Sequence, residues 1–215
     1  MNYTSSLVRL QIPESLRAAR AEALSRGIPL CEDETLQFLL LTLAMKKPRK
    51  VLEIGTAVGL SATAMLLACP DLCVTTVELE EERYLEAKSN FSKFGVSDRV
   101  TAYLGDAGEI LSMMDGQFDF VFLDGPKAQY ERYLFDLKRL LVDGGVIFAD
   151  DVLLFGWVDG KEETPQKRRS IVEKIRSYLA VVTEDPELIT SVIDIGDGVA
   201  LSVYHKTANG EGKSV

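Results

Sequence analysis

Cysteine, histidine and long apolar runs are scarce in this sequence. Cys31, Cys69 and Cys73 leave one cysteine unpaired in any disulfide scheme, and none has the C-x-x-C spacing of a zinc or redox motif. We therefore expect buried, reduced thiols. His205, the one histidine, falls in the last predicted strand, so we assign it no role and expect no histidine-based triad. The most apolar run, residues 38–45, is far shorter than the roughly 20 residues of a membrane-spanning helix.

Positive charge is scarce as well. The net charge of −9 argues against nucleic-acid binding through bulk electrostatics, although a local basic patch is compatible with the sequence. Residues 1–12 carry Arg9 but no long apolar stretch followed by a small-residue cleavage site, so we expect a cytoplasmic protein. With 215 residues, of which 47% are hydrophobic, the chain has the size of one compact domain.

From residue 50 onward, short β-branched runs alternate with amphipathic stretches. The predicted strands are 50–54, 73–78, 99–104, 118–123 and 146–150, and the helices between them are 61–68, 80–94, 107–114 and 129–142. This alternation predicts an α/β fold with a mostly parallel, Rossmann-like sheet. A helix over 166–182 then precedes strands 188–195 and 199–206, which Gly196-Asp197-Gly198 joins as an antiparallel C-terminal hairpin, giving seven strands.

Two predicted helices, 14–26 and 33–46, precede the first strand and are separated by Gly27-Ile28-Pro29. We expect them to cap the ligand-binding end of the sheet. The predicted organisation is one domain over residues 1–206, with N-terminal helices in 1–48 and the Rossmann-like core in 49–206. The small, polar tail 207–215 is expected to be disordered.

The turn after the first strand, V-L-E-I-G-T-A-V-G over residues 51–59, is the first candidate site. Gly55 and Gly59 lack the G-x-G-x-x-G spacing that lets backbone amides approach a pyrophosphate. S-adenosylmethionine has no phosphate, so its turn needs only enough glycine for the chain to pass beside the ligand. Glu53 could take the amino group of that ligand, directly or through water. The alternative is an ordinary strand-to-helix turn, which also favours glycine.

Acidic residues end the next two strands. Glu78 ends the second strand, where a carboxylate can accept both ribose hydroxyls, and Gly105-Asp106-Ala107 ends the third, suiting adenine. Alternatively, Glu78 and Asp106 are helix N-caps. The complete set of predicted cofactor-binding residues is Leu30, Glu53, Gly55, Thr56, Ser61, Glu78, Asp106, Ala107 and Asp124.

The fourth and fifth strands end in Asp124 and in the pair Asp150-Asp151. These hard oxygen ligands favour magnesium, or else manganese or calcium, over zinc, and a cation would relieve the repulsion within the pair. Alternatively, Asp151 caps a turn and Asp150 meets a lysine. Lys127 is a candidate general base, with a pKa that burial and a metal charge could lower; alternatively it is a solvated surface residue.

These motifs resemble the cation-dependent O-methyltransferases that include catechol and caffeoyl-coenzyme A methyltransferases. The resemblance covers most of the chain and implies that Asp124, Asp150 and Asp151 bind the metal and that Lys127 is the base. It also implies a homodimer. The sequence departs from the family at Asp151, where asparagine is usual, so the metal preference is open.

Within that family, the sequence resembles the bacterial branch that methylates 5-hydroxyuridine in tRNA. The resemblance rests on D-G-P-K-A-Q-Y over 124–130, V-L-L-F-G over 152–156, Q-K-R-R over 166–169 and I-G-D-G over 195–198. Basic residues in this region could meet tRNA phosphates, and an ordinary solvated helix face is equally compatible with them. They are Lys167, Arg168, Arg169, Lys174 and Arg176.

Two other acceptors or activities fit the sequence less closely. A small catechol-like diol would use the same acids and lysine, with Phe155 and Trp157 walling its pocket. A nicotinamide-dependent enzyme or a non-catalytic nucleotide binder is disfavoured, because the pyrophosphate glycines are missing and the three aspartates would have no purpose.

Overall fold

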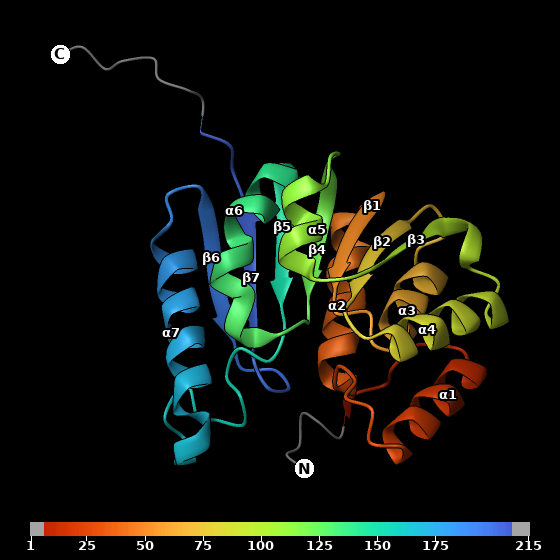
Figure 1. Ribbon diagram of the computed structural model, residues 1–215, viewed down its shortest axis with the longest axis horizontal. Coiled ribbons are helices and arrows are strands. Elements are labelled where there is room, and N and C mark those ends of the chain that lie inside the picture. The colour runs from red at the N-terminus through yellow and green to blue at the C-terminus, as the bar shows by residue number, and fades with distance from the viewer. Residues whose placement is uncertain (1–6, 208–215) are drawn as a thin grey trace.

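The computed structural model describes residues 7–207 and contains one seven-stranded sheet with helices on both faces (Figure 1). The order across the sheet is β3-β2-β1-β4-β5-β7-β6, and β7 alone runs antiparallel to its neighbours. This confirms the predicted Rossmann-like sheet with a C-terminal antiparallel hairpin. The strands are β1 Lys50–Ile54, β2 Cys73–Glu78, β3 Val100–Leu104, β4 Phe118–Leu123, β5 Leu141–Ala149, β6 Leu188–Ile193 and β7 Val199–Tyr204.

Two apolar cores, one on each face of the sheet, hold the helices in place. Apolar side chains of the first four helices pack on one face, and those of the last three pack on the other. No helix within residues 7–207 combines the length and apolarity needed to cross a membrane. The helices are α1 Glu14–Ser25, α2 Asp33–Lys46, α3 Leu60–Ala68, α4 Glu81–Lys93, α5 Ala107–Met113, α6 Tyr130–Leu140 and α7 Arg169–Glu184.

The fifth strand is longer than predicted. It begins at Leu141 rather than Val146, so α6 ends at Leu140 and the predicted helix 129–142 was too long. Leu141 is buried and pairs with Phe118, and the register then shifts before Phe120 pairs with Val146. The extra residues between the two pairs contain Gly144 and Gly145, so these glycines lie in a bulge of the strand instead of separating helix from strand.

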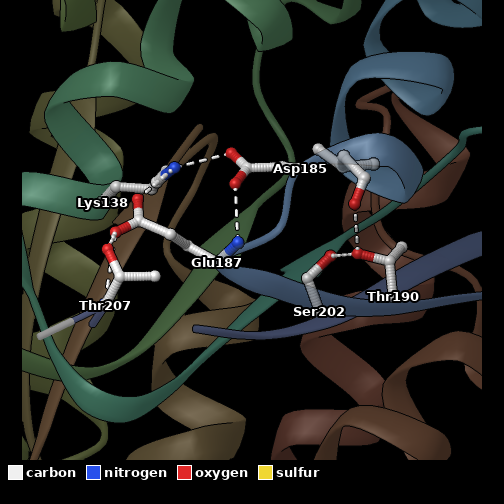
Figure 2. Close-up of polar contacts among 7 residues, drawn as sticks. Lys138, Asp185, Glu187, Thr190, Ser202 and Thr207 are labelled. Atoms are coloured by element: carbon white, nitrogen blue, oxygen red, sulfur yellow. Dashed lines mark hydrogen bonds and ion pairs between the residues drawn. The ribbon is translucent and has the colours of Figure 1, made fainter. Parts of the chain in front are cut away.

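An ion-pair network ties the C-terminal segment to the start of β6 (Figure 2). Lys138 Nζ on α6 lies 2.6 Å from Asp185 Oδ2 and 2.7 Å from Glu187 Oε2. The Thr207 hydroxyl donates to Glu187 Oε1 at 2.7 Å, so this first residue of the predicted disordered tail is anchored. The rest of that prediction, 208–215, lies outside the described residues.

Replacing Lys138 with methionine tests the contribution of this network to stability. The hydrogen bond from Lys138, followed by those from Thr207, lowers the pKa of Glu187 from 4.5 to about 2. A carboxyl whose pKa is lowered by folding stabilises the protein at pH values above its unfolded pKa. This stabilisation is lost as the pH falls through the folded-state pKa. We expect Lys138→Met to lower Tm by a few degrees at pH 7, and this difference from wild type to shrink below pH 4.5 and be smallest near pH 2. Thermal melts across pH measure it, and a difference independent of pH would contradict it.

Candidate active site

The register of the parallel strands aligns their carboxyl ends in one row. Ile54 pairs with Leu123, which pairs with Ala149, so the residues that follow them lie side by side. Backbone hydrogen bonds continue past the strands: Asp124 N donates to Ile54 O at 2.9 Å, and Asp150 N donates to Leu123 O at 3.0 Å. The acids that the sequence places after successive strands therefore meet at one edge of the sheet.

A cavity of about 400 Å³ opens along this row of strand ends. It is within the range of small-molecule and cofactor sites. The residues predicted from sequence that line it are Leu30, Gly55, Glu78, Asp106, Ala107, Asp124, Lys127 and Asp151. Leu30 follows α1, so the N-terminal helices contribute a wall through their connecting loop.

Gly55 lets the first turn pass close to the end of β4. It has φ +97, and a Cβ there would lie 2.4 Å from the carbonyl oxygen of Asp124. The turn and the β4 end are therefore in direct backbone contact, which only glycine permits.

Glu78 is held rigidly at the floor of the cavity. Its Oε2 accepts from Ala57 N at 2.7 Å, and its Oε1 accepts from Leu79 N at 3.0 Å and Glu80 N at 2.9 Å. Glu80, not Glu78, is the N-cap of α4. Three backbone amides thus fix a buried carboxylate that keeps free lone pairs for a ligand.

Asp106 caps a helix and lines the cavity at once. Its Oδ1 accepts from Glu109 N at 3.1 Å as the N-cap of α5. The capping alternative therefore holds for this residue. Its second carboxylate oxygen is left for a ligand.

Three predicted cofactor-binding residues are not on the cavity wall. Glu53, Thr56 and Ser61 are buried behind it. The Thr76 hydroxyl donates to Glu53 and is hydrogen-bonded to that of Thr56. Burial raises the pKa of Glu53 to about 8, and its Oε1 has no hydrogen-bond partner among residues 7–207. The structure therefore places Glu53 out of direct contact with a ligand in the cavity.

Asp124, Lys127 and Asp151 form an acid–lysine cluster at the other end of the cavity. Lys127 Nζ lies 2.6 Å from Asp124 Oδ1 and 3.0 Å from Asp151 Oδ2. Asp151 has φ +56, a left-handed conformation that aspartate and asparagine tolerate better than most residues. The alternative from the sequence paired Asp150 with a lysine. In the structure, Lys127 pairs with Asp124 and Asp151 instead.

Asp150 lies directly behind this cluster. It is 1% exposed, its Oδ1 accepts from Asp151 N at 2.8 Å, and its Oδ2 has no partner in the described part of the chain. Burial and the carboxylates of Asp124 and Asp151 raise its pKa well above the ordinary value. An unsatisfied buried carboxylate oxygen beside two other carboxylates suits a cation ligand.

The side chains do not, however, converge as a preformed metal centre. Within the range 7–207, no three acidic, histidine or cysteine side chains are arranged to hold one ion. The Lys127 ammonium is the cation that Asp124 and Asp151 share here. The carboxylates of Asp124, Asp150 and Asp151 are suitable ligands for a divalent ion and lie near one another. Binding such an ion requires Lys127 to leave its ion pairs.

The ion pairs of Lys127 act against the predicted lowering of its pKa. Burial alone would lower the pKa, but the charge of Asp124, followed by Tyr130, Asp151 and Asp150, outweighs it and raises the pKa well above the ordinary value. Lys127 is therefore an ion-paired ammonium whose side chain is only 12% exposed, not the solvated surface residue of the alternative.

The basic segment divides into two groups. Lys167 and Arg168 lie in the short 3-10 helix Gln166–Arg168 before α7, and Arg169 begins α7. All three are exposed and make no ion pair within the described residues. Arg176 donates from Nε to Val158 O at 2.9 Å and from Nη2 to Trp157 O at 3.3 Å. Arg176 therefore holds the loop after β5. The start of α7 lies at the same end of the sheet as the carboxyl ends of the parallel strands (Figure 1).

Sequence reasoning missed several residues of the cavity wall. Pro29, Arg83 and Tyr133 line it, although no motif marks them. Tyr133 lies three residues after Tyr130 on α6 and reads as part of an ordinary apolar helix face. His205, as expected, is elsewhere, with Nδ1 4.0 Å from Asp143 Oδ1.

The sheet order, the glycine turn and the acid at the end of β2 together define a Rossmann-like methyltransferase. A family model described as O-methyltransferase matches residues 4–205. The chain belongs to this O-methyltransferase family.

Individual relatives agree with this assignment. The caffeoyl-CoA O-methyltransferase of Populus kitakamiensis is 31% identical over 173 residues, 77% of this chain and 74% of that protein. A Staphylococcus aureus structure classed as a caffeoyl-CoA O-methyltransferase has a TM-score of 0.86 and 28% identity, covering 94% of this chain and 97% of that one. The O-methyltransferase TomG from Streptomyces achromogenes, solved with S-adenosylmethionine, has a TM-score of 0.80 and 26% identity over 95% of each chain. These findings confirm the predicted enzyme class, an S-adenosylmethionine-dependent O-methyltransferase.

Proposed function

We propose that this protein transfers the methyl group of S-adenosylmethionine to a hydroxyl of 5-hydroxyuridine in tRNA, with a divalent cation at the acid–lysine cluster. The observation that carries the proposal is a single cavity that joins Glu78 and Asp106 to Asp124, Lys127 and Asp151. Glu78 suits the ribose hydroxyls and Asp106 with Ala107 suits adenine. The methyl-bearing part of the cofactor then extends toward the cluster.

In the proposed reaction, the residues orient the acceptor and handle one proton. The Lys127 ammonium first leaves its ion pairs with Asp124 and Asp151 and releases a proton to solvent. The neutral amine then accepts the proton of the acceptor hydroxyl. The oxygen bonds to the methyl carbon while the carbon–sulfur bond breaks, leaving S-adenosylhomocysteine. Holding both reactants in one cavity removes much of the entropic barrier.

The cation we propose is magnesium, or else manganese or calcium, held by Asp124, Asp150 and Asp151. The support is the uniformly hard oxygen donor set and the unpartnered buried oxygen of Asp150. Such an ion supplies charge that lowers the pKa of a bound hydroxyl.

Two groups of charges support an acceptor whose negative groups lie away from the reacting hydroxyl. Carboxylates lie near the acid–lysine cluster, and exposed basic side chains lie at the start of α7. Burial and the charge of Asp151 raise the pKa of Asp197, and burial and Asp197 raise that of Glu32, so further carboxylates surround the cluster. They would repel an anion at the reacting centre. Positive side chains at the amino end of α7 interact unfavourably with the helix dipole. A nucleic-acid phosphate bound there would offset this cost. The unpaired side chains there are Lys167, Arg168 and Arg169.

A small catechol-like diol is the second candidate acceptor. Phe155 is 61% exposed and its ring centroid lies 5.1 Å from that of Trp157, so an aromatic pair is available on the loop that follows the cluster. An aromatic pair suits a flat ring of either acceptor.

Charge reversal of the basic residues distinguishes the two acceptors. We expect Lys167→Glu, Arg168→Glu and Arg169→Glu together to raise KM for tRNA at least about tenfold and to flatten its salt dependence, because phosphate contacts are lost. Activity on a catechol should stay unchanged. The matched control reverses Lys50, Lys88 and Lys93, away from the loop after β5. Steady-state kinetics at several salt concentrations measure this, and equal KM values for both triple variants would refute a phosphate-binding role.

A further inference from the structure

We infer that Tyr133 is a cofactor-binding residue whose hydroxyl hydrogen-bonds the adenine base, an inference that rests on the proposed use of S-adenosylmethionine. Tyr133 lies on the first turn of α6, is 1% exposed and lines the cavity with Asp106 and Ala107. It therefore stands at the end of the cavity that suits the base.

The hydroxyl of Tyr133 is free to bind a ligand. No residue between 7 and 207 makes a hydrogen bond with it, yet it is not sealed in the core as the hydroxyl of Tyr178 is. Tyr130, one turn earlier on the same helix, donates instead to Leu123 O at 2.9 Å and Asp150 O at 3.2 Å. A hydroxyl that lines the cavity and has no protein partner can donate to a ligand bound there.

The neighbouring residue on α6, Arg132, packs against the start of α5. A Cβ at Gly108 would lie 3.0 Å from the Arg132 guanidinium and 3.1 Å from Asp106 Oδ1, so the arginine lies against the first turn of α5. Burial, followed by the charge of Asp106, raises the pKa of Tyr133, which keeps its O–H as a donor at neutral pH. A neutral donor beside a carboxylate acceptor is a combination that can recognise both the ring nitrogens and the amino group of adenine.

The test compares Tyr133→Phe with wild type by calorimetric binding of S-adenosylhomocysteine and of adenosine alone. We expect both dissociation constants to rise about tenfold, because both ligands carry the base. The Tm of the ligand-free variant should not fall, because its hydroxyl has no protein partner to lose. Tyr204→Phe, at the end of β7 and outside the cavity lining, is the control and should bind as wild type does.

The outcomes separate this inference from the proposed function. Dissociation constants of Tyr133→Phe within twofold of wild type would overturn it while the proposed function stands. A lowered Tm with unchanged affinity would assign the hydroxyl to the fold and also overturn it. Failure of the wild type to bind S-adenosylhomocysteine would refute the proposed cofactor site, and the role of Tyr133 with it.

Discussion

Replacing Asp150 with alanine is expected to reduce methyl transfer by about a thousandfold or more while S-adenosylhomocysteine still binds within about threefold of wild type. Asp150 does not line the cavity, so its replacement should not change the affinity for the cofactor. Its unpartnered Oδ2 lies beside Asp124 and Asp151, so the proposed cation site loses one of its three carboxylates.

Asp150→Asn separates a lost ligand from a misfolded site. Asparagine keeps the volume and the oxygen that accepts from Asp151 N, so the turn after β5 should survive. We expect Tm near that of wild type, weaker activation by magnesium and reduced methyl transfer. Full activity of Asp150→Ala in the presence of a chelator would exclude the metal-dependent mechanism.

Replacing Gly55 with alanine is expected to weaken S-adenosylhomocysteine binding about a hundredfold. The new Cβ would meet Asp124 backbone atoms at 2.4 and 2.8 Å, which cannot give way unless the ends of β1 and β4 separate. Overpacking of this kind typically costs about 1–3 kcal/mol, and about 2.7 kcal/mol corresponds to a hundredfold change in affinity.

Gly95→Ala is the matched control for this prediction. Gly95 also has positive φ, +68, but a Cβ there has no atom within 4 Å. In both variants, alanine in a left-handed backbone conformation costs about 1–2 kcal/mol. Only Gly55→Ala adds a clash with backbone atoms. Calorimetry and thermal melts of the two variants measure the difference. Equal cofactor affinity in both would show that the approach of Gly55 to Asp124 does not shape the site.

Much of this fold could be predicted because its signals are local. Alternating β-branched and amphipathic segments give the parallel sheet, and acids placed after successive strands are carried to one edge by the register. The bulge in β5 could not be predicted, because Gly144-Gly145 reads equally as a helix stop or as a place where a strand bends.

The site was less predictable wherever the outcome depends on three-dimensional neighbours. Glu53 adjoins the glycine turn in sequence, but the alternation of side chains along a strand turns it into the core. The Lys127 pKa depends on which of two opposing effects is larger, and that is decided by ion-pair distances. Tyr133 belongs to the apolar core and also lines the cavity, and its place on an apolar helix face indicates only the first of these.

Incubation of the purified protein with labelled S-adenosylmethionine, magnesium and tRNA containing 5-hydroxyuridine, with a parallel tube containing a catechol, tests the central claim most directly. Digestion and mass spectrometry then locate the methyl group. The proposal predicts label on the 5-oxygen of that nucleoside, loss of labelling with chelator, and little label in the catechol. Label in the catechol alone would replace the acceptor but keep methyl transfer to oxygen. Label in neither, from protein that binds S-adenosylhomocysteine, would contradict the account.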